Sequence, residues 1–260
     1  GQVEAPLLIK PYLSSMTRHE LLIIMTVGMS TIAGSVMVVY TTMLFPIYGT
    51  GLIGHFLSAS LISVPAAIMY ANMIIPSNEK TEFPDKKSDD MYSSIMDAIT
   101  QGTKNGLDIF LNVIAMLIVV MALVFLVNSL LGLLPNLNGN PITLELILGY
   151  LFAPLAWFMG ISWSESIIAG QLLGVKTVLN EFVAYLYLSD TETYKLADKT
   201  RMIMLYALCG FANFSSVGIL LSGLSAMVPE RRADLISVSG KALWCALLAS
   251  CLTGFIVGIL

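Results

Sequence analysis

Two carboxylates lie in stretches that are otherwise almost free of charge, and each has an amide close by. Glu4 follows Gln2 after one residue, and Glu181 directly follows Asn180. A carboxylate accepts strong, charge-assisted hydrogen bonds from sugar hydroxyls, and an amide offers a paired donor and acceptor to the edge of a base. Glu181 is therefore a candidate for binding a polyol, and Gln2 with Glu4 for binding a ring edge. The alternative for either carboxylate is a structural bond to an exposed helix N-terminus.

Each carboxylate is followed, at a similar distance along the chain, by a polar interruption of a long apolar segment. The first interruption is centred on Thr31, and the second contains Asn213 and Ser216. Small and hydroxyl residues in such segments also serve close helix packing, which is the simpler explanation. Interrupted apolar segments at corresponding positions of two halves, however, indicate a transporter's binding site near the middle of the membrane. Asn213 and Ser216, one helical turn apart, are expected to point the same way and complete the polyol site.

The elements that must position these residues are membrane-spanning helices. Hydrophobic residues make up 57% of the 260 positions and charged residues 12%. A helix needs about 20 mainly apolar residues to cross a bilayer core of about 30 Å. Stretches free of Asp, Glu, Lys and Arg that meet or approach this length are Leu21–Phe45, Leu52–Ile75, Ile109–Leu134, Met202–Met227 and Ala242–Leu260. The sequence therefore predicts an all-α polytopic membrane protein, an inverted-repeat transporter with re-entrant hairpins and broken transmembrane helices.

The predicted organisation is one integral membrane domain over 1–260. Ser164–Leu173 and Val175–Leu179 are too short to span separately, so they predict a re-entrant hairpin with Asn180 and Glu181 at its tip. Gly1–Ile9 is expected to be the tip and returning arm of an equivalent hairpin whose outgoing arm would precede residue 1. The expected parts are the first tip, broken helix and following helix (1–75), a polar loop with an amphipathic segment (76–106), a long scaffold helix (107–135), the second hairpin and broken helix (143–227) and the last transmembrane helix (241–260).

Other polar residues suggest supporting roles. Thr143–Met159, with Pro154 inside it, is expected to be an interfacial or half-inserted helix. Asp108 is expected to supply the N-terminal charge of the helix that follows it. Lys176 either pairs with Glu181 or extends to the interface. The net charge of −4 disfavours a nucleic-acid partner, and the three cysteines form no metal-binding or disulfide pattern.

At these same residues the sequence resembles the concentrative nucleoside transporter family, in family order over nearly the whole chain. The matching motifs are Gly-Gln-Val-Glu-Ala-Pro-Leu-Leu-Ile (1–9), Met-Thr-Arg-x-Glu-Leu (16–21), Thr-Ile-Ala-Gly-Ser-Val (31–36), Gly-Val-Lys-Thr-Val-Leu-Asn-Glu-Phe-Val-Ala-Tyr (174–185) and Cys-Gly-Phe-Ala-Asn-Phe-Ser-Ser (209–216). The chain is similar to the family's C-terminal portion.

The resemblance implies a multi-pass inner-membrane homotrimer of transport domains around a scaffold that includes the long helix. It assigns base contacts to Gln2, Glu4 and Val36, and ribose contacts to Glu181, Phe211, Asn213 and Ser216. It places the coupling sodium beside the Thr31 hydroxyl and the Ile32 carbonyl, with further ligands expected before residue 1. It implies no cofactor other than Na⁺ or H⁺ as the coupling ion.

One departure from the family concerns the base, and several alternatives stay open. The family commonly has Thr where this chain has Val3, so base preference does not carry over. Related bacterial members use protons, which leaves the coupling ion open. An intramembrane enzyme using Glu4 and Glu181 as acid and base is disfavoured, because the sequence has no His-Glu-x-x-His motif. A channel would need rings of pore-lining charges. Pseudouridine or a nucleobase is an alternative substrate.

Overall fold

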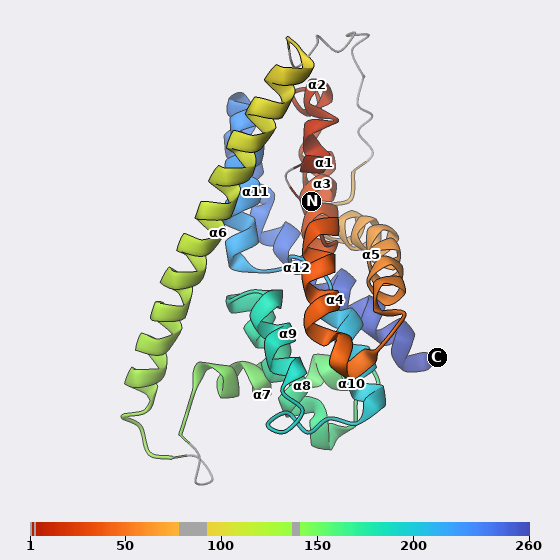
Figure 1. Ribbon diagram of the computed structural model, residues 1–260, viewed down its shortest axis with the longest axis vertical. Helices are drawn as coiled ribbons and strands as arrows, with labels where there is room; N and C mark the ends of the chain where they lie inside the picture. Colours follow the sequence, from red (N-terminus) through yellow and green to blue (C-terminus); the bar gives the residue numbers. More distant parts are fainter. Residues whose placement is uncertain (1, 3, 78–92, 137–140) are drawn as a thin grey trace.

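A computed structural model describes residues 2, 4–77, 93–136 and 141–260, and every regular element in these ranges is helical (Figure 1). The first part of the chain forms α1 (Glu4–Leu7), α2 (Lys10–Leu13), α3 (Arg18–Ser30), α4 (Gly34–Tyr48) and α5 (Leu52–Ile74). A long helix, α6 (Ile95–Leu131), follows. The second part forms α7 (Leu144–Phe158), α8 (Trp163–Val178), α9 (Glu181–Ser189), α10 (Asp198–Ala207), α11 (Phe214–Met227), a short 3₁₀ turn η1 (Pro229–Arg231) and α12 (Arg232–Ile259). The prediction of an all-α fold is confirmed.

Both predicted helix breaks are present. The first separates α3 from α4 at 31–33, and the second separates α10 from α11 at 208–213. α3 begins with a capping box, in which Thr17 accepts from the Glu20 amide while the Glu20 carboxylate accepts from the Thr17 amide. Such a cap satisfies free amides at the start of the helix and fixes its first residue.

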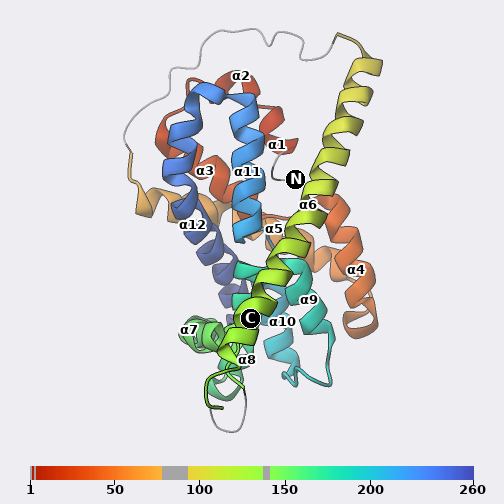
Figure 2. The same ribbon diagram turned by 90° about the vertical axis from the view of Figure 1, so that its left-hand side faces the viewer.

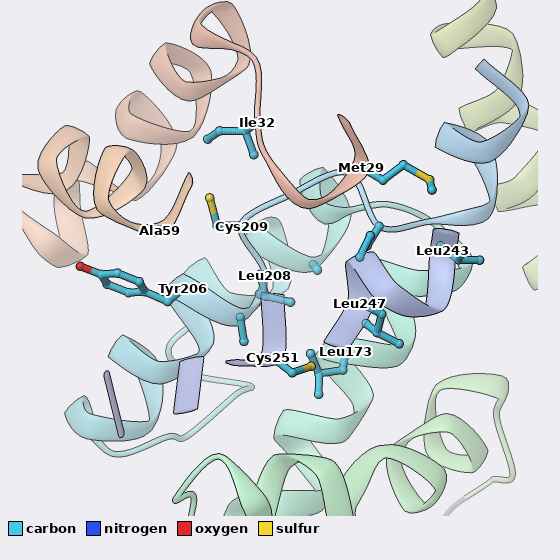
Figure 3. Packing of buried hydrophobic residues seen from close by; sticks show 14 of the residues in the cluster. Met29, Ile32, Ala59, Leu173, Tyr206, Leu208, Cys209, Leu243, Leu247 and Cys251 are labelled. Atoms are coloured by element: carbon cyan, nitrogen blue, oxygen red, sulfur yellow. The ribbon is translucent and has the colours of Figure 1, made fainter. Parts of the chain in front are cut away.

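The two broken helices touch at their breaks. Gly210 has φ +123°, and a Cβ added there would lie 2.6 Å from the carbonyl oxygen of Ser30. Glycine permits both this left-handed backbone and the close approach. Figure 3 shows Met29, just before the first break, and Ile32, within it, in one buried cluster with Leu208 and Cys209 of the second. The place where the two breaks meet is therefore part of the apolar core.

The second hairpin consists of α8 and α9. α8 continues through Gly174 to Val178 as one helix, so the two short segments expected for the outgoing arm are joined. The chain turns at Leu179–Asn180, and the Asn180 side chain caps α9 by accepting from the Val183 amide at 3.0 Å. α8 packs tightly on α7, since a Cβ at Gly170 would lie 2.4 Å from the Gly149 carbonyl oxygen. α7 and α8 form a bent pair with an angle of 118°.

Several helices are long and apolar enough to cross a bilayer. By length and composition these are the broken pair Arg18–Tyr48, α5 and Pro229–Ile259, and the bent α7–α8 pair adds a fourth if it counts as one span. Only 33% of the apolar window of α5 is buried inside the protein. An apolar helix with this much outward surface requires lipid or another chain around it. The chain is a multi-pass membrane protein.

α6 is longer than the predicted scaffold helix over 107–135. It has 37 residues and begins after Ser94, whose hydroxyl accepts from the Asp97 amide at 3.1 Å. Asp108 is therefore inside the helix, and the prediction that it supplies an N-terminal charge is wrong. Figures 1 and 2 show α6 running along one side of the other helices. Near its end, Asn128 donates to Glu145 at 3.0 Å and accepts from the Leu144 amide at 2.7 Å, which joins α6 to the start of α7.

Candidate functional site

Glu181 lies at the hairpin tip, where it joins the two halves of the fold. It is the first residue of α9, and 5% of its surface is exposed. One carboxylate oxygen, Oε1, accepts from the Tyr40 hydroxyl at 2.7 Å, and Oε2 accepts from the Asn213 amide nitrogen at 2.9 Å. Tyr40 belongs to α4 and Asn213 is the N-cap of α11, so the second half of each broken helix, with its cap, supplies one donor. The buried carboxylate is thus satisfied by charge-assisted hydrogen bonds from both repeats.

Asn213 is a helix cap as well as a partner of Glu181. It is 1% exposed, and its Oδ1 accepts from the Ser216 amide at 2.7 Å. Asn213 and Ser216 are thus joined through the Ser216 backbone, and Asn213 precedes the helix rather than lying one turn along it. Ser216 is 4% exposed. Phe211 lies within the break, half-buried against the core, and its carbonyl accepts from the Asn213 amide at 2.8 Å.

Tyr40 is a site residue that the sequence reasoning missed. It is 1% exposed and packs beside Tyr185, with ring centroids 4.8 Å apart, and near Phe56 at 6.2 Å. A tyrosine buried among apolar residues normally finds a partner for its hydroxyl. The rule predicts that the Tyr40 hydroxyl has a hydrogen-bond acceptor if the residue is buried. Only the fold shows that this acceptor is Glu181.

Gln2, in the segment predicted to be the first hairpin tip, lies beside α3. Gln2 is 9% exposed, and its backbone and Cβ lie beside Gly28, where an added Cβ would be 3.5 Å from the Gln2 carbonyl oxygen. Its side-chain Oε1 is buried with no hydrogen-bond partner among the described residues. Glu4 begins α1, but its side chain and all of Val3 lie outside the described residues. Val36, in the first turn of α4, is partly buried against the core.

The first break presents oxygen atoms at the end of α3. Thr31 is the C-cap of this helix, and its hydroxyl donates to the Val27 carbonyl at 3.1 Å. Ile32 follows with 8% of its surface exposed. The unwound backbone and C-terminal end of a half-helix are the groups that transporters use to coordinate a coupling cation. The Thr31 hydroxyl oxygen and the Ile32 carbonyl are chemically suited to this role.

Lys176 has neither of the two roles expected for it. Its surface is 0% exposed, so the side chain does not extend to the interface. Both residues lie in the described part of the chain, and no ion pair joins Lys176 to Glu181 there. Nζ donates instead to the Ala207 carbonyl at 2.9 Å and to the Ser250 hydroxyl at 2.7 Å. The reason is that the Lys176 side chain reaches the end of α10, which offers an acceptor with partial negative charge, and a serine hydroxyl of α12.

Comparison with known proteins identifies relatives over the whole chain. A family model described as Na⁺ dependent nucleoside transporter C-terminus matches residues 55–258. An uncharacterized transporter of Bacillus subtilis, YutK, is 41% identical over all of this chain and 64% of its own length. The nucleoside permease NupC of Helicobacter pylori is 38% identical over all of this chain and 62% of its own length. Human solute carrier family 28 member 3 is 37% identical, and the chain covers 40% of it.

Comparison with solved structures identifies similar proteins over the whole chain as well. CNTnw in an inward-facing, substrate-bound state is 36% identical, with a TM-score of 0.85 over all of this chain and 61% of that one. A variant of CNTnw in an outward-facing state has a TM-score of 0.84 at 36% identity, again over 61% of its length. The chain thus spans less than two thirds of the relatives and structures that it matches.

Proposed function

Because the chain belongs to the Na⁺-dependent nucleoside transporter family, we propose that the protein imports nucleosides by cation symport through a binding site where its two helix breaks meet. The family consists of transporters, so the enzyme alternative is not carried further. The observation that carries the proposal is the position of Glu181, a buried carboxylate held between α4 and α11 at the tip of the second hairpin.

The sugar half of the site is proposed to be Glu181 with Phe211, Asn213 and Ser216. A carboxylate has about four lone pairs, and Tyr40 and Asn213 use two of those on Glu181. The others can accept the vicinal hydroxyls of a ribose. Phe211 and Ser216 lie in the break and in the first turn of α11, on either side of Asn213. A deoxy sugar would leave at least one of these carboxylate lone pairs without a hydroxyl donor.

The base half is proposed to be Gln2, Glu4 and Val36. The support comes from Gln2, whose buried Oε1 has no partner in the described part of the chain. A buried amide oxygen without a partner is destabilising, and an N–H group on a base edge would satisfy it. Val36 offers an apolar surface in the first turn of α4. The base edge and the sugar would then contact opposite repeats.

The coupling ion is proposed to be Na⁺, bound at the end of α3 by Thr31 and Ile32. The family's dependence on Na⁺ supports the ion, and the oxygen atoms at the first break support the place. Because Gln2 lies beside Gly28, one turn before this break, a cation here would order the base half of the site. Proton coupling is the alternative, and the uptake experiment described below must distinguish it from Na⁺ coupling.

Transport is proposed to proceed by alternating access in a homotrimer. The similar CNTnw structures are titled with inward-facing and outward-facing states, which supports movement of the hairpins and broken helices as one unit. α6 is proposed to belong to the fixed scaffold. Its contacts are with α7 and α11, and large apolar residues along it, such as Phe125 and Leu130, are exposed. Neighbouring protomers and lipid would cover this surface.

Uptake of labelled uridine and adenosine by the full-length protein in proteoliposomes tests the proposal. A Na⁺ gradient and a proton gradient are imposed separately, with an excess of unlabelled pseudouridine or uracil as competitors. Accumulation above equilibrium under one gradient establishes symport and identifies the ion. Equilibration without accumulation indicates a channel, and competition by uracil as strong as by uridine indicates a nucleobase carrier.

A further inference from the structure

The positively charged ammonium group of Lys176 is completely buried and forms hydrogen bonds to two helices. Its Nζ donates to the Ala207 carbonyl of α10 and to the Ser250 hydroxyl of α12. Ser250 directs its own proton to carbonyls of the preceding turn, at Ala246 or Leu247, so its oxygen is available to accept from the lysine. A charged group inside the membrane region is expensive, and such groups mark functional sites far more often than plain packing positions.

The position of Lys176 relative to the second break is specific. Ala207 is the last residue of α10, immediately before the break, and Asn213 is the last residue of the break and caps α11. α8 holds the first of these through Lys176, and α9 holds the second through Glu181. The two arms of one hairpin therefore fix both ends of the break. The separation between Asn213 and Glu181 depends on where the end of α10 is held.

The first break is held differently. At the end of α3, the corresponding place in the other repeat, the proposed positive charge is the dissociable coupling cation beside Thr31 and Ile32. At the end of α10 the positive charge is Lys176, which is part of the chain. Each broken helix thus has a cation at the negative end of its first half, which is the favourable arrangement for the helix dipole.

Resting on the proposed function, we propose that Lys176 is a positioning residue that acts as a permanently attached counterpart of the coupling cation. Its ammonium keeps the end of α10, and through it Asn213 and Glu181, in the geometry that binds the sugar. The sugar half of the site is then preformed, whereas the base half becomes ordered only when the ion binds. Lys176 itself acts through Ala207 and Ser250 and makes no contact with the nucleoside.

The test compares the binding of uridine and 2′,3′-dideoxyuridine to purified full-length protein by calorimetry. Lys176→Met keeps the length of the side chain and removes the charge. We expect uridine affinity to fall about tenfold, with a much smaller change for the dideoxy compound, so that discrimination between the two is largely lost. Lys241→Met, on an exposed position of α12, is the matched control and should leave both affinities unchanged.

A purely structural lysine would lower the unfolding temperature without changing this discrimination. If folded Lys176→Met protein discriminates between uridine and 2′,3′-dideoxyuridine as strongly as the wild type does, the inference is overturned, while the proposed function stands. Wild-type protein that binds neither compound overturns both. If Lys176→Met does not fold, Ser250→Ala provides the test. It removes one of the two hydrogen-bond acceptors of Lys176 and keeps the lysine charge. We then expect discrimination to fall about threefold, and an unchanged ratio overturns the inference.

Discussion

Gly210 lies so close to Ser30 that any side chain at position 210 would collide with the backbone of the other repeat. A Cβ there would be 2.6 Å from the Ser30 carbonyl oxygen and 2.8 Å from its carbonyl carbon. Since Gly210 is in the second break and Ser30 ends α3, this contact connects the proposed cation site to the proposed sugar site through the backbone alone.

Gly210→Ala is expected to abolish uptake and to destabilise the protein. The left-handed backbone at this position costs a non-glycine residue about 1–3 kcal/mol, and forcing the two breaks apart adds a similar amount. Thermal unfolding in detergent and uridine uptake measure the two effects. Gly218→Ala in α11, where an added Cβ meets nothing within 4 Å, is the control and should be neutral or slightly stabilising. Equal behaviour of the two variants would show that the breaks do not pack as described.

Tyr40→Phe is expected to destabilise the protein more than Tyr48→Phe. Both residues belong to α4, but the Tyr40 hydroxyl donates to the Glu181 carboxylate at 2.7 Å and that of Tyr48 to the Arg201 carbonyl at 3.1 Å. A hydrogen bond to a charged group is worth about 1.5–3 kcal/mol, against about 0.5–1.5 kcal/mol for a neutral one. Unfolding temperatures of the two variants, measured side by side, give the order. A larger loss for Tyr48→Phe would mean that Glu181 does not depend on Tyr40.

Val3→Thr is expected to change the rank order of nucleosides. This prediction comes from the sequence, because Val3 lies outside the described residues and because the family commonly has Thr between the Gln and the Glu. A restored hydroxyl would offer the base a hydrogen-bonding group, directly or through water. Competition of uridine uptake by cytidine, adenosine, guanosine and inosine gives the order. Identical inhibition constants for the variant and the parent would remove position 3 from base recognition.

The parts of the fold that the sequence predicted are those with strong local signals. Polar interruptions of long apolar runs at Thr31 and Asn213 predicted both breaks, and an acid with an amide between short apolar segments predicted the tip at Glu181. The sequence placed the scaffold helix over 107–135 with an amphipathic segment before it, and the structure joins the two into one helix that Ser94 caps. The helix then continues through polar residues before it becomes apolar.

The parts that the sequence could not predict are contacts between distant segments. Tyr40 and Glu181 are brought together only by the packing of α4 on α9. Nothing in the sequence around either residue indicates the other as its partner. Lys176 was expected to pair with the nearest acid or to reach the interface, because sequence separation was the only available guide. Its actual partners, Ala207 and Ser250, belong to α10 and α12, which are distant from Lys176 in the sequence.

The most direct test of the central claim is the effect of Glu181→Gln on sugar recognition. Binding of uridine and 2′,3′-dideoxyuridine to the full-length protein is measured for the wild type, for Glu181→Gln and for the control Glu165→Gln. The carboxylate of Glu165 accepts from Ala197 and Thr200, away from the proposed site. We predict that Glu181→Gln weakens uridine about 10- to 100-fold and leaves the dideoxy compound nearly unchanged, while Glu165→Gln keeps the wild-type ratio. Equal loss for both ligands in Glu181→Gln would contradict the assignment of Glu181 to the sugar.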